Sequence, residues 1–210
     1  PLLHNGRETL RRYDGVLGGG PALDLFGDSI TFDEYFDLLE ESRPGINVGC
    51  LVGNVSLRLA VMGNAMRPPT DDELAHMKSL VSEAMESGAF GLSSGLIYAP
   101  GSYAQPDELI ELASVVAGYG GIYTTHMRNE GDKLLDSIRE TIQLARESEI
   151  RAQISHIKAS GRKNWGQSSE ALSVIRDARE DGIEITADQY PYNAGSTGLY
   201  ALLPPDTLAN

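Results

Sequence analysis

Hydrophobic positions along the chain follow two alternating patterns. Short apolar runs, typical of buried strands, cover residues 46–53, 89–96, 121–128, 151–158 and 183–190. Between them lie longer segments in which apolar residues recur every three or four positions, the spacing of one helix face. This regular succession of strand, helix and strand predicts repeated βα units around a parallel sheet.

Local signals suggest where several helices begin. An apolar helical pattern covers residues 31–41, and Thr70 with Glu73 forms a capping box before the next helix. Asp132 is expected to cap a helix with Leu134 or Leu135 inside, and Ser168 to open another. The inner face of that last helix is predicted to carry Leu172, Ile175 and Ala178.

Two architectures can hold such units, an open doubly wound sheet or an arc of an eight-stranded barrel. No G-x-G-x-x-G or G-x-x-x-x-G-K-[ST] motif follows any strand, which favours the barrel. Residues 1–30 are glycine-rich without periodicity and are read as an irregular N-terminal segment. We therefore expect an α/β fold over residues 31–210, a partial TIM-type barrel of about five consecutive βα units.

Charge and composition narrow the range of partners. Lysine and arginine number 17 against 30 acidic residues, so the formal charge of -13 argues against nucleic acid. No apolar run approaches the roughly 20 residues that span a bilayer, so no membrane is expected. The only cysteine, Cys50, has no disulfide partner in the chain and suggests a cytoplasmic location.

Candidate chemistry lies where strands end, because barrel active sites occupy the carboxyl ends of the strands. His126 and His156 occupy matching places near the ends of two successive runs. Adjacent strands lie about 4.8 Å apart, so the two imidazoles can meet on one metal ion. The alternative is that each is a partly buried histidine bonded to backbone or water.

Several polar residues near the two histidines are also candidates for a role in the site. By the strand period of two, Lys158 lies on the side of His156, where it would clamp a substrate carboxylate or form an ordinary ion pair. Arg128 and Glu130 are expected to pair and orient their loop. Asp188 is either an outer partner of a metal-bound histidine or a buried structural acid. His4 and His76 are interpreted as solvated residues.

Several blocks in one order resemble the D-aminoacylases, the N-acyl-D-amino-acid deacylases of the amidohydrolase superfamily. They are Asn-Val-Gly-Cys-Leu-Val-Gly-Asn-Val-Ser-Leu-Arg (47–58), Gly-Leu-Ser-Ser-Gly-Leu-Ile-Tyr-Ala-Pro (91–100), Thr-His-Met-Arg-Asn-Glu (125–130), Ser-His-Ile-Lys (155–158) and Asp-Gln-Tyr-Pro-Tyr-Asn-Ala-Gly-Ser-Thr (188–197). The resemblance implies barrel strands three to seven, with His126 and His156 as zinc ligands on strands five and six. It also implies an N-acyl-D-amino-acid pocket lined by Tyr98, Lys158, Tyr190 and Ser196, with Lys158 and Ser196 near the substrate carboxylate.

The chain departs from that family's pattern in three places. It contains no His-x-His motif and no Gly-Asn-Cys-Gly block, and Cys50 stands in another block, so we interpret it as a buried structural thiol and not as a ligand. The general-base aspartate of the eighth strand is expected beyond Asn210. No catalytic residue is therefore predicted within the chain, which alone should bind zinc weakly and turn over little or no substrate.

Two other functions remain open at this point. One is a non-catalytic half-barrel that self-associates through exposed sheet edges. The other is a cyclic-amide amidohydrolase such as a hydantoinase, against which the Tyr-Pro-Tyr and Gly-Ser-Thr blocks argue by resemblance.

Overall fold

The computed structural model describes residues 30–198. Nearly all of the predicted irregular segment 1–30 lies outside the described residues. Within them, five parallel strands form one sheet in the order β1-β2-β3-β4-β5. The strands are β1 (Leu51–Gly53), β2 (Gly91–Gly95), β3 (Ile122–His126), β4 (Arg151–Ile154) and β5 (Ile185–Ala187).

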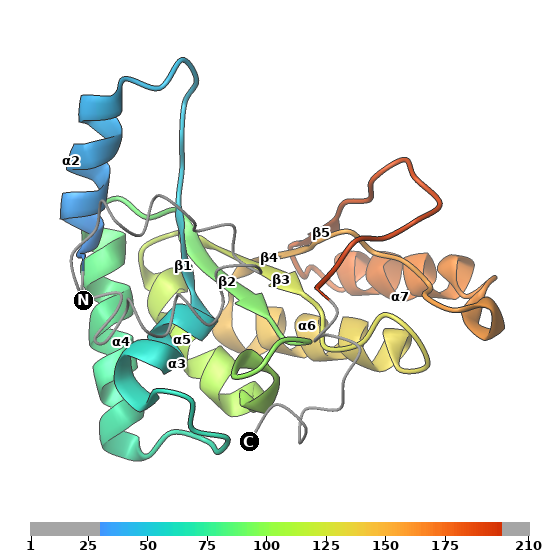
Figure 1. Cartoon of the computed structure of the whole chain (residues 1–210). Coiled ribbons are helices and arrows are strands. Elements are labelled where there is room, and N and C mark those ends of the chain that lie inside the picture. Colours follow the sequence, from blue (N-terminus) through green and yellow to red (C-terminus); the bar gives the residue numbers. More distant parts are fainter. Residues whose placement is uncertain (1–29, 199–210) are drawn as a thin grey trace.

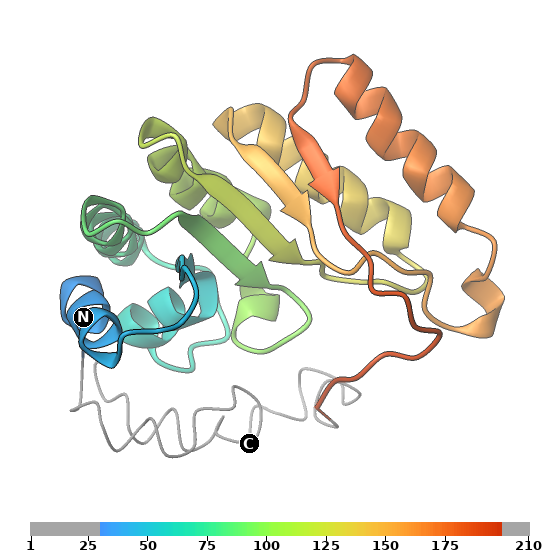
Figure 2. The ribbon, with the colours of Figure 1, turned by 90° about the horizontal axis from the view of Figure 1, so that it is seen from above.

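Helices connect the strands and cover one face of the sheet, as Figures 1 and 2 show. They are α3 (Asn54–Met62), α4 (Asp71–Glu86), α5 (Pro106–Gly118), α6 (Leu134–Ser148) and α7 (Ser168–Glu180), with short 3-10 helices at Gly101–Tyr103 and Arg162–Asn164. A further helix, α2 (Phe32–Ser42), precedes β1 and packs against α4. Each helix from α3 to α7 packs on the next one. Sequential strand order and a single helical layer are the arrangement of a barrel arc, since a doubly wound sheet reverses its order and carries helices on both faces. The partial-barrel prediction is confirmed.

The register of the sheet separates an apolar row from a polar one. The apolar row faces the helices and is buried, and it consists of Val52, Leu92, Tyr123, Ala152 and Ile185. One position further along each strand, the polar row on the opposite face consists of Gly53, Ser93, Thr124, Gln153 and Thr186. The hydrophobic core therefore lies between sheet and helices, and polar side chains line the other face.

The predicted capping box at Thr70 is confirmed, and the predicted cap at Asp132 is wrong. Thr31 and Thr70 both form capping boxes, with Glu34 and Glu73. Asp132 caps nothing: α6 begins after Lys133 without a side-chain cap, because the Asp132 carboxylate accepts hydrogen bonds from Lys163 and Asn164. The predicted set of buried residues on α7 is also partly wrong. Ile175 and Ala178 are buried, but Leu172 is 52% exposed because it lies on the outer side.

A buried ion pair that the sequence did not reveal joins α3 to α5. Helix α3 begins directly after β1, and its Arg58 is fully buried against Glu108 in the first turn of α5. Asn54 donates to the same carboxylate at 3.0 Å. Burial raises the pKa of Glu108, although Asn54 and Arg58 oppose that shift. The pair fixes the first helix after β1 to the helix that follows β2.

None of the helices within residues 30–198 is long and apolar enough to cross a bilayer.

Candidate functional site

The candidate residues gather at the carboxyl edge of the sheet. His126 is the last residue of β3, His156 lies two positions past β4, and Asp188 directly follows β5. In Figure 2 the arrows of β2, β3, β4 and β5 all point the same way, toward the edge of the sheet where these residues lie. The parallel topology thus brings together side chains that are far apart in the sequence.

The two histidine rings face each other across this edge. Nδ1 of His126 lies in hydrogen-bond contact with Nε2 of His156, and the ring centroids are 4.4 Å apart with the planes inclined by 51°. Loss of solvation, with the facing His156 ring and Lys158 adding to it, lowers the pKa of His126. A neutral imidazole is the form that binds a metal. Two ring nitrogens that face each other are candidates for two ligands of one cation.

An unusual backbone conformation turns His156 toward its partner. Its φ is 43°, in the left-handed region that a non-glycine residue adopts at a cost of about 1–3 kcal/mol. The backbone N–H of His156 donates to Asp188 Oδ1 at 2.7 Å, and Gln153 Nε2 donates to Asp188 Oδ2 at 2.7 Å. The His156 N–H, more than the Gln153 bond, lowers the pKa of Asp188. Asp188 therefore holds the histidine backbone, and it is exposed, which corrects the reading as a buried structural acid.

Glu130 joins His156 to Lys158. Its Oε1 lies 2.8 Å from His156 Nδ1 and 2.5 Å from Lys158 Nζ, and the ammonium is 2.9 Å from Nδ1. The expected Arg128–Glu130 pair is therefore wrong. Lys158 does reach His156, but not through the strand period, because β4 ends at Ile154.

Arg128 instead secures the loop that follows β2. Its guanidinium contacts both carboxylate oxygens of Glu140 on α6 and donates to the backbone carbonyls of Ser102 at 2.9 Å and Ala104 at 2.8 Å. This loop, which begins after Gly95, contains Tyr98, one of the predicted substrate-binding residues. Arg128 thus ties a candidate pocket wall to the helical layer.

The remaining predicted pocket residues are only partly brought together. Tyr190 lies beside Lys158, with Nζ 5.6 Å from the ring centroid, and the Tyr98 hydroxyl is 3.1 Å from Thr197 Oγ1. Segment 188–197, red in Figure 1, therefore spans from β5 to the loop after β2. Ser196 is exposed, and no hydrogen bond joins it to Lys158 among the described residues.

The other candidate ligands lie elsewhere. Cys50, expected to be buried, is only half-buried, although it packs against the hydrophobic core. His76 is exposed on α4, as expected. His4 lies outside the described residues. Across residues 30–198, no cluster of three or more histidine, cysteine or acidic side chains could hold a metal ion. Within the described residues, His126 and His156 are therefore the two candidate ligands that lie together.

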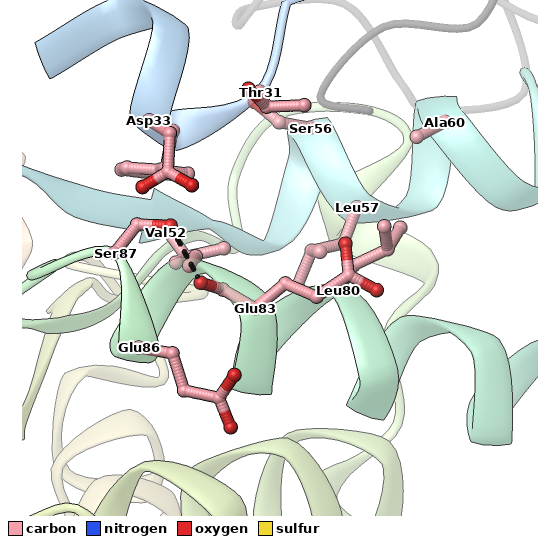
Figure 3. Close-up of a pocket in the computed structure, with 12 residues that line it drawn as sticks. Thr31, Asp33, Val52, Ser56, Leu57, Ala60, Leu80, Glu83, Glu86 and Ser87 are labelled. Atoms are coloured by element: carbon pink, nitrogen blue, oxygen red, sulfur yellow. Dashed lines mark hydrogen bonds between the residues drawn. The ribbon is translucent and has the colours of Figure 1, made fainter. Parts of the chain in front are cut away.

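A separate cavity of about 280 Å³ opens between α2, α3 and α4. Figure 3 shows the carboxylates of Asp33, Glu83 and Glu86 around it, with Ser56 and Ser87. None of the predicted site residues lines this cavity, so the candidate site is the histidine edge.

Comparison with known proteins agrees with the fold and the sequence blocks. No protein-family model matches the chain. The chain is 42% identical over 184 residues to a D-aminoacylase of Alcaligenes xylosoxydans xylosoxydans, covering 84% of the chain and 37% of that protein. An N-acyl-D-glutamate deacylase of the same organism is 41% identical over 179 residues, with the same coverage.

A solved structure matches the described fold directly. It is an N-acyl-D-glutamate deacylase from Bordetella bronchiseptica, complexed with zinc and a phosphonate mimic of the tetrahedral intermediate. The TM-score is 0.78 at 40% identity, covering 84% of this chain and 38% of that one. The resemblance seen in the sequence is confirmed, and the chain spans little more than a third of the relatives it matches.

Proposed function

We propose that this chain is a D-aminoacylase-type segment of a zinc-dependent hydrolase that deacylates N-acyl-D-amino acids. The observation that carries the proposal is the meeting of His126 and His156 at the carboxyl edge of the sheet. The similar proteins support it, because two of them are a D-aminoacylase and an N-acyl-D-glutamate deacylase, and the matching solved structure is a complex with zinc.

In this proposal His126 and His156 hold the zinc ion through Nδ1 and Nε2, the atoms that face each other. Bound zinc polarises an amide carbonyl and makes hydroxide available near neutral pH, which suits hydrolysis of an amide C–N bond. The left-handed backbone of His156, held by Asp188, keeps its ring directed at His126. In this proposal the two donor nitrogens are therefore already positioned in the metal-free protein.

Lys158 and Tyr190 form the proposed recognition point for the substrate carboxylate. The Lys158 side chain is 21% exposed and its ammonium lies 5.6 Å from the centroid of the Tyr190 ring, so in this proposal a substrate carboxylate binds beside that ring. Tyr98 and Ser196 complete the proposed pocket, one from the loop after β2 and the other from segment 188–197. Because no hydrogen bond joins Ser196 to Lys158 among residues 30–198, the role of Ser196 requires segment 188–197 to move toward the substrate.

The proposal assigns no general base to the chain. Two histidines make up only part of a zinc site, which normally takes three protein ligands and water in a catalytic enzyme. We therefore propose weak zinc binding and little or no hydrolysis by the 210 residues alone. The missing aspartate and ligands would come from the remaining strands of a complete barrel.

Hydrolysis of N-acetyl-D- and N-acetyl-L-amino acids tests this function. The two samples are the 210-residue chain and a polypeptide extended through its flanking coding sequence to the length of its relatives. We expect the extended protein to contain zinc, to hydrolyse the D substrate, and to lose zinc on His126→Ala. An extended protein without zinc, or one that retains zinc after His126→Ala, contradicts the proposal.

A self-associating half-barrel is the second candidate, favoured by one observation. In the described sheet, β1 and β5 each pair on one side only. Such edges pair readily with other strands, so we propose association of the isolated chain through them, with neither nucleic acid nor a membrane as partner. The single cysteine supports a cytoplasmic location within the same proposal.

A further inference from the structure

We propose that Glu130 is a positioning residue that fixes the proton of His156 on Nδ1 and at the same time anchors Lys158. The inference rests on the proposed function and assigns a role to a residue that had been expected to form only a structural pair. It follows from the geometry of one carboxylate oxygen with two neighbours, His156 Nδ1 at 2.8 Å and Lys158 Nζ at 2.5 Å.

The three contacts permit two proton arrangements. In the first, His156 Nδ1–H donates to Glu130, which leaves a lone pair on Nε2 facing His126. In the second, Lys158 donates to Nδ1 at 2.9 Å, so Nε2 carries the proton and cannot bind a cation. Bonds to a charged partner occur in both arrangements, but in the second the lone pair of Nδ1 would face the Glu130 carboxylate oxygen, which can only accept, at 2.8 Å. Glu130 therefore selects the first arrangement.

Burial strengthens this selection. The side chains of Glu130, Lys158 and His156 are 17%, 21% and 27% exposed, so water competes weakly for the carboxylate. A metal-binding histidine commonly donates its second ring N–H to a carboxylate, which fixes both tautomer and ring orientation. Glu130 connects this function to Lys158, so the metal side and the substrate side of the site share one anchor.

Two substitutions separate the two roles. Glu130→Leu removes both contacts. Glu130→Gln keeps a carbonyl oxygen for Nδ1–H but loses the charge that attracts Lys158. The matched control is Asp132→Asn, which removes a carboxylate from the same loop whose partner is Lys163, not Lys158. Unfolding temperature, followed by circular dichroism, shows that each variant is folded.

Side-chain ¹⁵N NMR of the histidines in the metal-free 210-residue chain is the first readout. We expect a pyrrole-type signal for His156 Nδ1 in the unmodified chain, in Glu130→Gln and in Asp132→Asn. In Glu130→Leu we expect a mixture of tautomers. A pyrrole-type signal at Nε2 in the unmodified chain, or the same tautomer in Glu130→Leu, overturns the proposal.

Zinc titration of the same samples is the second readout. We expect Glu130→Leu to bind Zn²⁺ about tenfold to a hundredfold more weakly than the unmodified chain, and Asp132→Asn to bind equally well. Equal affinity in Glu130→Leu contradicts the role of Glu130. Absence of binding in the unmodified chain counts against the metal site of the proposed function instead, and the NMR result then decides the role of Glu130 alone.

Discussion

Glu108→Leu should destabilise the fold sharply, because it leaves the Arg58 guanidinium buried without its carboxylate. The side chains of Arg58 and Glu108 are 0% and 2% exposed, so neither charge can turn to water. Removing one partner of such a pair costs about 3–5 kcal/mol. Folded domains have a total stability of about 5–15 kcal/mol, so one substitution would take a large share of it.

The double variant Arg58→Met/Glu108→Leu should recover most of that loss. A buried ion pair replaced by apolar groups of similar size is often neutral or stabilising. Some cost remains because Arg58 also donates to the carbonyl of Arg67 at 2.7 Å. The free energy of unfolding is measured by urea denaturation, with an unchanged dependence on urea as the check of two-state behaviour.

An exposed pair on neighbouring helices provides the control. Lys78 and Glu111 are 38% and 50% exposed, and Lys78→Met or Glu111→Leu should each change stability by at most about 1 kcal/mol. The reasoning is refuted if Glu108→Leu costs less than about 1 kcal/mol. It is equally refuted if the double variant loses the sum of the two single losses, since additivity would show that the pair does not interact.

Three further predictions concern the sheet, the pocket loop and acid stability. Gly91→Ala should prevent native pairing of β2 with β3, because the added carbon would meet a β3 carbonyl oxygen at 1.9 Å; soluble yield and circular dichroism check this against Gly45→Ala, which meets nothing within 4 Å. Arg128→Met should cost about 1–3 kcal/mol and speed amide hydrogen exchange in residues 101–104, and unchanged exchange would contradict the clamp. The hydrogen bond from Arg67, more than any other contact, lowers the pKa of Glu73 to about 2. The stability that ionised Glu73 contributes is therefore complete above pH 4.5 and is lost as the pH falls toward 2. Glu73→Gln should make the free energy of unfolding depend less on pH in this range, and an unchanged pH dependence would refute this.

Much of the fold was accessible from the sequence because it depends on local patterns. Apolar runs located the five strands of the described residues, and the capping box at Thr70 marked the start of α4. Helix α3 was missed because it follows β1 with no intervening turn and begins without a side-chain cap that would mark its start. Leu172 was misplaced because periodicity cannot tell which of two adjacent positions the neighbouring helix covers.

The candidate site was accessible only in outline. Matching positions at two strand ends suggested that His126 and His156 meet, and the structure brings them together. The partners of Arg128 and Glu130 could not be inferred, because they depend on how a loop turns after the strand ends. Likewise, no pattern in the sequence indicates that His156 adopts a left-handed backbone, which places its ring and that of His126 in contact.

The central claim is that His126 and His156 bind one cation together, and a zinc titration of the chain with each histidine replaced by alanine tests it most directly. The account predicts that either substitution alone removes the same binding event and that the double substitution removes nothing more. Zinc binding that survives both single substitutions, or two separate losses that add, would contradict it.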